Sequence, residues 1–200
     1  MVGWVVPPSK KPEKVKEEFS KERTERVKWL IKEGFLRSEG VIEAMLKVPR
    51  EDFTLEAYRD YAYLEVPLPI PGREATISCP HSYPLFYEVL GLTEGDKLLE
   101  VGTGSGYGAV LAREVVGLSG KVVTVEIDEE TYNFARENVE KLGYDDILLV
   151  LGDGSLGYLS EAPYDKICIT AACPRIPDPL IHQLKPNGKL IAPIRHPSIP

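Results

Sequence analysis

Cysteine, glutamine and asparagine are scarce in this sequence of 200 residues. The three cysteines, Cys79, Cys168 and Cys173, are odd in number and follow no metal-ligand spacing. We therefore expect reduced thiols, no bound metal and a cytoplasmic protein. A single glutamine, Gln183, and three asparagines accompany abundant lysine and glutamate. This composition favours a thermophilic source, because thermolabile amides are avoided and ion pairs are plentiful.

Long apolar runs and an excess of positive charge are also absent. No segment approaches the length of a membrane span, and no signal-peptide pattern opens the chain. Aspartates and glutamates number 31 against 24 lysines and arginines, giving a net charge of −7. This balance disfavours nucleic acids and anionic membranes as partners. At this length we expect one domain with a substantial buried core.

The most informative stretch is 97–108, with the sequence K-L-L-E-V-G-T-G-S-G-Y-G. A short apolar run precedes four alternate glycines, and a helix-prone segment at 107–116 follows them. A strand, a glycine turn and a helix in this order begin a nucleotide-binding α/β unit. The glycines let the backbone turn sharply and approach a ligand, which then faces the positive end of the helix.

Glu100 indicates which nucleotide this unit binds. The strict G-x-G-x-x-G pattern of dinucleotide sites is absent, although Gly104-x-Gly106-x-x-Ala109 fits its looser form. An acid directly before the glycines would repel a phosphate, but it can hold the cationic amino-acid part of S-adenosylmethionine, directly or through water. An NAD-dependent oxidoreductase is the alternative, and it leaves this acid unexplained.

The rest of the chain predicts an α/β alternation behind a helical extension. Residues 1–12 read as a loose arm, and the helices at 13–33 and 39–48 carry apolar faces that we expect to serve packing. The linker at 48–72 is irregular and aromatic, which suits a segment that covers a site. We expect further helices at 85–90, 129–142 and 180–184, and strands at 98–101, 121–126, 147–151, 165–170 and 188–194.

Acidic residues end two of the other predicted strands. Glu126 ends the strand at 121–126 and can accept both hydroxyls of a ribose, while Asp153 follows the strand at 147–151 and can accept from an adenine amino group. Any one such acid is more commonly a turn residue or a helix cap. Three acids in register with a glycine turn instead predict one ligand crevice at the carboxyl edge of the sheet.

The segment at 76–81, T-I-S-C-P-H, precedes a predicted helix and can present hydroxyl, imidazole and backbone N–H groups to an anion. Capping of that helix by Ser78 or Ser82 is an equally weighted alternative. Cys79 beside His81 also suggests a thiol nucleophile, which we disfavour because neighbours in sequence need not meet in space. Cys168 lies inside a predicted strand and belongs to the core.

Together these motifs resemble the protein-L-isoaspartate O-methyltransferase family over about residues 41–194. The matching segments are V-P-R-E-D-F, P-L-P-I, T-I-S-C-P-H, L-E-V-G-T-G-S-G-Y, G-D-G-S-L-G, A-P-Y-D and T-A-A-C-P-R-I-P. The resemblance implies a three-layer α/β/α Rossmann-like methyltransferase fold with a mostly parallel sheet and an N-terminal helical extension. It predicts an arm and helix at 1–35 and a methyltransferase domain at 36–200, without the C-terminal strands with which the family continues.

The resemblance also assigns roles to individual residues. It implies Ser78 as the catalytic residue and no metal site. The implied cofactor-binding residues are Glu100, Gly102, Gly104, Ser105, Glu126, Asp153 and Gly154. The implied substrate-binding residues are Thr76, Ile77, His81, Thr170, Ala171 and Ala172.

The implied activity is methylation of the carboxylate of L-isoaspartyl residues in damaged proteins, which leads to their repair through a labile methyl ester. S-adenosylmethionine is the implied cofactor and S-adenosylhomocysteine its product. The acceptor carboxylate is already ionised at neutral pH, so no strong general base is needed and Ser78 serves as an orienting hydrogen-bond donor. The implied partners are proteins or peptides carrying isoaspartyl residues, with no nucleic acid and no membrane.

Two departures from the family pattern keep alternatives open. Arg73-Glu74-Ala75 stands where the family usually has a glycine and a glutamine before the threonine, and Ser82 stands where it usually has a methionine. Both changes concern the peptide site and leave the cofactor site untouched. The alternatives are a methyltransferase of the same ancestry with a different acceptor and a catalytically silent cofactor-binding protein.

Overall fold

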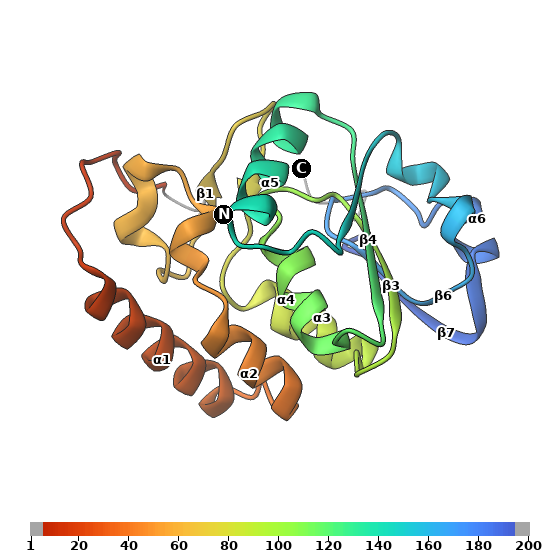
Figure 1. The fold of residues 1–200 in the computed structure, drawn as a ribbon, viewed down its shortest axis with the longest axis horizontal. Coiled ribbons are helices and arrows are strands. Elements are labelled where there is room, and N and C mark those ends of the chain that lie inside the picture. The colour runs from red at the N-terminus through yellow and green to blue at the C-terminus, as the bar shows by residue number, and fades with distance from the viewer. Residues whose placement is uncertain (1–5, 195–200) are drawn as a thin grey trace.

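A parallel five-stranded sheet forms the centre of the protein. The computed structural model describes residues 6–194, and Figure 1 shows the arrangement of its strands and helices. The strands are β3 (Lys97–Val101), β4 (Lys121–Glu126), β5 (Leu148–Leu151), β6 (Tyr164–Ile169) and β7 (Leu184–Ile191). They lie in the order β5-β4-β3-β6-β7 and every neighbouring pair is parallel. The chain therefore changes direction across the sheet at β3, and open α/β sheets bind ligands outside the carboxyl ends of strands at such a point.

Apolar side chains alternate between the two faces of this sheet. Leu98 and Val122 belong to a core cluster that includes residues of several helices. Leu99 and Val123, one position further along each strand, belong to a second cluster that includes Leu180. Because successive residues of a strand point to opposite faces, two buried faces require continuous apolar runs. The predicted α/β fold with a mostly parallel sheet is confirmed.

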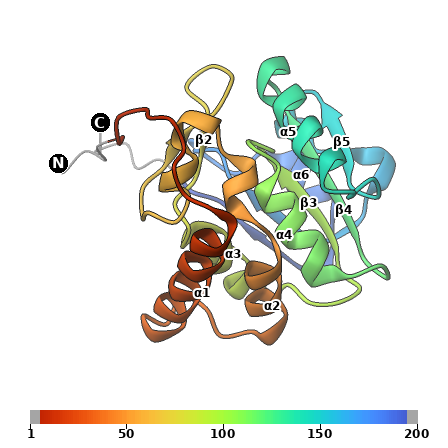
Figure 2. The same cartoon turned by 60° about the vertical axis from the view of Figure 1, so that its left-hand side comes forward.

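The helices are α1 (Lys16–Lys32), α2 (Glu39–Lys47), α3 (Ser82–Leu90), α4 (Tyr107–Val116), α5 (Glu129–Lys141) and α6 (Asp178–His182). Figure 2 shows α1 and α2 at the side of the molecule where α3 and α4 lie, and α2 contacts both of them. Helix α1 buries Phe19, Val27 and Leu30. The predicted packing role of the apolar face is confirmed for these three residues, and the helix begins at Lys16, three residues after its predicted start.

The linker at 48–72 contains two short 3-10 helices, η1 (Arg50–Phe53) and η2 (Glu56–Tyr61). It ends in strand β1 (Leu68–Pro69), which pairs antiparallel with β2 (Thr76–Ile77). This two-stranded sheet joins the linker directly to the segment that contains Ser78. The irregular character predicted for the linker is confirmed.

Two predicted boundaries near the C-terminal end are wrong. The helix predicted at 180–184 is α6, two residues earlier, because Pro179 is tolerated in the first turn of a helix, where no N–H partner is needed. The strand predicted at 188–194 is β7, which begins at Leu184 and runs through Pro186 and Asn187. A register shift against β6 between Tyr164 and Lys166 accommodates them.

Within residues 6–194, no helix combines the length and the apolar character needed to cross a bilayer. Residues 1–5 of the predicted arm and residues 195–200 of the predicted domain lie outside the described residues. The predicted boundary at residue 35 stays a prediction.

Candidate active site

A cavity of about 610 Å³ lies at the carboxyl edge of the sheet, where β3, β4 and β6 end. Three parts of the chain that are far apart in sequence form it: the loop around β2, the glycine turn with the end of β4, and the segment after β6. The lining residues are Arg73, Glu74, Ala75, Thr76, Ser78, Tyr83, Gly102, Gly104, Glu126, Ile127, Asp128, Thr131, Thr170, Ala171 and Ala172.

The glycine turn after β3 forms one wall of the cavity. Gly102 has a φ of 96° and Gly104 a φ of 57°, a region that residues with a Cβ rarely adopt. A Cβ at Gly102 would lie 2.6 Å from the Thr170 hydroxyl oxygen. A Cβ at Gly104 would meet nothing closer than the Thr76 carbonyl oxygen at 3.8 Å. The turn thus packs closely at Gly102 against the segment that follows β6, and it leaves room for a ligand at Gly104.

Glu126 ends β4 and faces this turn. Its Oε2 accepts a hydrogen bond from the backbone N–H of Gly104 at 3.0 Å. Its Oε1 accepts from the backbone N–H groups of Ile127 and Asp128 at 2.9 and 3.1 Å. The side chain is 8% exposed and lines the cavity. Because each carboxylate oxygen has two acceptor sites, Oε1 is fully used and Oε2 retains one site for a ribose hydroxyl.

The charge of the cavity lining is mainly negative. The acids Glu74, Glu126 and Asp128 outnumber the single base among the lining residues, Arg73. Hydrogen bonds from the backbone N–H and hydroxyl of Thr131, at 2.9 and 3.0 Å, hold the pKa of Asp128 below its usual value. Asp128 is therefore ionised at neutral pH. A lining of this kind favours a cationic ligand over a pyrophosphate.

Glu100 lies beneath the cavity and is not among its lining residues. It is fully buried, and its Oε2 accepts a hydrogen bond from the Thr124 hydroxyl at 2.7 Å. Its Oε1 has no partner within the described part of the chain and lies 2.3 Å from where a Cβ on Gly108 would be. Burial raises the pKa of Glu100 to about 8. The structure places this acid on the α4 side of the sheet, and its cofactor role stays a prediction.

Ser78 follows β2 and lines the opposite wall of the cavity. Its carbonyl oxygen accepts a hydrogen bond from Nη2 of Arg50 at 2.6 Å. The same guanidinium donates from Nε to the carbonyl of Ala62 at 2.6 Å. Arg50 is fully buried and thereby fixes the backbone at Ser78 against the linker. The α3 residue Tyr83 lines the cavity beside this segment.

Residues 170–172 close the cavity after β6. The hydroxyl of Thr170 donates to the carbonyl oxygens of Val101 and Gly102, at 3.1 and 2.6 Å, and so joins this segment to the glycine turn. Ala171 and Ala172 are exposed and line the cavity with no polar side chain. What this segment offers a ligand is its backbone N–H and carbonyl groups.

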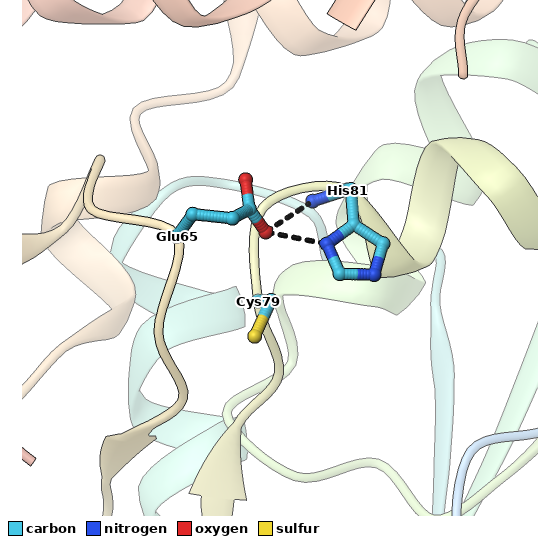
Figure 3. A group of neighbouring side chains, drawn as sticks. All are labelled: Glu65, Cys79 and His81. Atoms are coloured by element: carbon cyan, nitrogen blue, oxygen red, sulfur yellow. Dashed lines mark hydrogen bonds and ion pairs between the residues drawn. The ribbon is translucent and has the colours of Figure 1, made fainter. Parts of the chain in front are cut away.

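His81 lies outside the cavity lining, in contact with the linker (Figure 3). Its Nδ1 lies 2.5 Å from Oε1 of Glu65, and its backbone N–H donates to the same oxygen at 3.3 Å. The thiol of Cys79 is the third member of this group, whose potential ligand atoms all lie within 4.8 Å of one another. Burial raises the pKa of the Cys79 thiol, and the nearby Glu65 carboxylate adds to the increase. A protonated thiol is a poor nucleophile, which counts against Cys79 as an attacking group.

Four further predicted site residues lie outside the cavity lining. Asp153 caps η3 (Gly154–Leu156) by accepting from the Ser155 N–H at 2.9 Å. Gly154 packs against Val101, since an added Cβ would lie 2.5 Å from a Val101 methyl carbon. Ser105 and Ile77 are buried. Their assigned roles stay predictions.

The cavity therefore brings together Ser78, Gly102, Gly104, Glu126, Thr76, Thr170, Ala171 and Ala172 from the predicted set. Sequence reasoning missed Tyr83 and Thr131, which line the same cavity. A signal for Thr131 existed, because it lies three residues after Asp128, the spacing at which a helix N-cap side chain accepts from the backbone. No sequence signal distinguishes Tyr83 from Tyr87, the other core tyrosine of α3.

Comparisons with known proteins show the family to which this chain is similar. The family model described as protein-L-isoaspartate(D-aspartate) O-methyltransferase matches residues 21–199. A relative from Archaeoglobus fulgidus, named protein-L-isoaspartate O-methyltransferase 2, is 49% identical over 173 residues, which cover 86% of this chain and 78% of that protein.

Two solved structures are similar over most of this chain. One, described as a protein-L-isoaspartate O-methyltransferase, is 37% identical with a TM-score of 0.79 and covers 86% of this chain; this chain spans 55% of its length. The other is a Plasmodium falciparum protein described as a candidate member of the same family in complex with S-adenosyl-L-homocysteine. It is 26% identical with a TM-score of 0.77 and covers 88% of this chain and 85% of its own.

Proposed function

The chain belongs to the protein-L-isoaspartate(D-aspartate) O-methyltransferase family of S-adenosylmethionine-dependent enzymes, and we propose that it methylates the carboxylate of L-isoaspartyl residues in the cavity described above. The observation that carries this proposal is the joint presence of Ser78, the glycine turn and Glu126 in one cavity lining. The methyl donor and the acceptor can therefore meet there. The expected outcome of the reaction is repair of the damaged residue through its methyl ester.

The wall formed by the glycine turn and the end of β4 suits S-adenosylmethionine. Glu126 presents the remaining acceptor site of Oε2 to a ribose hydroxyl, and Gly104 leaves open space above the turn. The acids of the lining attract a ligand whose net charge is positive. When bound, S-adenosylmethionine supplies a methyl group activated by attachment to a sulfonium. Glu100 supports the turn from beneath as part of the buried chain Thr103–Thr124–Glu100.

The opposite wall around Ser78, together with residues 170–172, suits a peptide carboxylate. A carboxylate with an ordinary pKa near 4 is ionised at neutral pH, so the protein needs to orient it and not to deprotonate it. We assign the orienting hydrogen bond to the Ser78 hydroxyl, with Thr76 beside it. The backbone groups of 170–172 bind the peptide, and closing the cavity around it excludes water.

The proposed partners are proteins and peptides that carry isoaspartyl residues. The net charge of −7 supports the proposal that neither nucleic acids nor membranes are partners. Reduced cysteines support a cytoplasmic location. We also propose that residues 1–35 form an extension to a methyltransferase domain at 36–200.

A different acceptor is the competing function, and Arg73 and Glu74 are the observation that favours it. Both line the cavity and both depart from the family pattern. If the acceptor were a small molecule, these two charged residues would be expected to contact it. Peptide methylation and small-molecule methylation are therefore distinguished by the acceptor that is labelled.

Replacement of the Ser78 hydroxyl tests the assignment of the site. In Ser78→Ala we expect methyl transfer to an isoaspartyl peptide to fall by about 10- to 100-fold, the range for losing a hydrogen bond to a charged group. Binding of S-adenosylhomocysteine, measured by calorimetry, should not change. Ser160→Ala, at an exposed position in η4 (Leu159–Glu161), is the matched control. Unchanged transfer in Ser78→Ala would contradict the assignment.

A further inference from the structure

We propose that Glu65, in the linker, is a positioning residue that holds the 78–81 segment in the orientation needed for peptide methylation. The inference rests on the proposed function and adds to it a residue outside the cavity. Glu65 does not line the cavity. Its carboxylate acts on the site only through the backbone and imidazole of His81.

The first observation is the contact between Glu65 and His81 (Figure 3). One carboxylate oxygen, Oε1, accepts from the backbone N–H of His81 at 3.3 Å and lies 2.5 Å from Nδ1 of its ring. These two contacts from His81 to one Glu65 oxygen fix both the backbone and the ring of His81. Because an ionised carboxylate can only accept a hydrogen bond, this contact favours ring forms that carry a proton on Nδ1.

The second observation is that Glu65 is itself held in place. Its other oxygen, Oε2, accepts from Nη1 of Arg26 at 3.1 Å. The Arg26 guanidinium also donates from Nε and Nη2 to the carbonyl of Tyr63, at 2.9 and 2.6 Å. Helix α1 therefore fixes the linker at two points, and the orientation of Glu65 is set from outside the active site.

The third observation is a second attachment at the other end of the segment. Arg50 donates to the carbonyl of Ser78, as described above, and to that of Ala62. The segment is thus held to the linker at residue 78 by a buried cation and at residue 81 by an anion. A hydrogen bond at each end of the segment restricts rotation of the backbone from residue 78 to residue 81. The position of Ser78 in the cavity lining is thereby fixed.

The same group of side chains is poorly suited to hold a metal ion. Two donors on one zinc ion, each at about 2.0–2.1 Å, are separated by more than 3 Å in a tetrahedral site. The His81 Nδ1 and Glu65 Oε1 atoms are only 2.5 Å apart and form a direct hydrogen bond, which leaves no space for an ion between them. The second carboxylate oxygen is occupied by Arg26. A positioning role, by contrast, is consistent with all the hydrogen bonds that Glu65 makes to His81 and Arg26.

The test compares Glu65→Leu, which removes both acceptor oxygens, with Glu65→Gln, which keeps one. Glu161→Leu is the matched control, because Glu161 is equally exposed (24% against 25%) and bound by two lysines far from the cavity. We measure kcat and KM for an isoaspartyl peptide, and the affinity for S-adenosylhomocysteine. Thermal unfolding shows that each variant is folded.

We expect kcat/KM for the peptide to fall roughly 10- to 100-fold in Glu65→Leu, because small displacements of orienting groups have effects of this size. Glu65→Gln should recover part of the loss, while S-adenosylhomocysteine affinity and the control stay at wild-type values. A wild-type kcat/KM in Glu65→Leu would overturn the proposal. So would an equal loss of S-adenosylhomocysteine affinity, because that pattern indicates general disruption.

A second readout does not depend on activity. The backbone amide resonance of Ser78 should shift in Glu65→Leu and stay in place in Glu161→Leu, and an unmoved resonance would overturn the positioning role. If the wild-type protein itself transfers no methyl group to the peptide, the proposed function fails. The resonance shift then decides the positioning role by itself.

Discussion

The carboxylate of Glu126 accepts a hydrogen bond from the backbone N–H of Gly104 at 3.0 Å, which joins the end of β4 to the glycine turn after β3. Two residues that are 22 positions apart in sequence thereby form one wall of the cavity. This bond, together with those from Ile127 and Asp128 to the other oxygen, fixes the orientation of the Glu126 carboxylate. Glu126 therefore stabilises the conformation of the glycine turn in addition to its proposed role in ligand binding.

Replacing Glu126 should weaken cofactor binding more than it weakens folding. In Glu126→Gln one oxygen still accepts from the backbone, but the negative charge and the second acceptor are lost. We expect the affinity for S-adenosylhomocysteine to fall by about 10- to 100-fold, the range for hydrogen bonds that involve a charged group. Calorimetry measures this change. Glu130→Gln, exposed on α5, removes the same charge and should bind as the wild type does; equal affinities in the two variants would contradict the role of Glu126.

Gly102 and Gly143 provide a matched pair for the glycine turn. Both have positive φ values, 96° and 77°, but an added Cβ clashes with Thr170 only at Gly102 and meets nothing within 4 Å at Gly143. We expect Gly143→Ala to cost about 1–2 kcal/mol of unfolding free energy from backbone strain alone. Gly102→Ala should cost more and also weaken S-adenosylhomocysteine binding. Urea denaturation and calorimetry test both statements, and identical results for the two variants would contradict them.

Several elements of this fold could be predicted closely from the sequence. The bounds of α4 and β4 agree with the prediction to the residue, because glycines or an acid end each apolar run. The C-terminal elements could not be placed as well. Pro186 and Asn187 are typical of turns, yet β7 passes through them because a register shift against β6 relieves the local conflict. Pairing between strands is a tertiary effect that a single segment does not reveal.

The candidate site was predicted only in part, for a related reason. Sequence position places Glu100 at the end of a strand, but the alternation along β3 turns its side chain toward the same face as Leu98 and away from the cavity. In the same way, the position of His81 next to the serine motif does not show that its ring faces the linker. The contact of Glu65 with His81 depends on how the linker packs against the segment at 78–81, so the sequence alone does not reveal it.

Glu100 makes folding stability depend on pH. Burial raises its folded-state pKa to about 8 from an ordinary value of 4.5, so the folded protein keeps a proton that the unfolded chain releases. This favourable contribution is fully present below pH 4.5 and is lost as the pH rises toward 8. The free energy of unfolding should therefore fall across this range by up to about 1.4 kcal/mol per pH unit relative to a variant without the acid.

Glu100→Gln tests this dependence because an amide has nearly the shape of the carboxyl group but does not titrate. Urea denaturation of both proteins between pH 5 and 8 gives the difference in slope. We expect the variant to gain stability relative to the wild type as the pH rises. A constant difference across the range would show that the buried carboxyl group does not hold a proton.

The thiol of Cys79 should be dispensable. Burial and the Glu65 carboxylate raise its pKa, so it is protonated at neutral pH and unsuited to attack a substrate. Cys79→Ala should therefore transfer methyl groups to the isoaspartyl peptide at nearly the wild-type rate, and iodoacetamide should not inactivate the wild type rapidly. A loss as large as that of Ser78→Ala would restore the thiol as a candidate nucleophile.

The most direct test of the proposed function compares two peptides that differ only in one aspartyl or isoaspartyl linkage. Each is incubated with the protein and with S-adenosylmethionine that carries a labelled methyl group. We predict base-labile label on the isoaspartyl peptide and none on the aspartyl peptide. Equal labelling of the two peptides, or cofactor binding without labelling of either, would contradict the account and indicate a different acceptor for the same cofactor site.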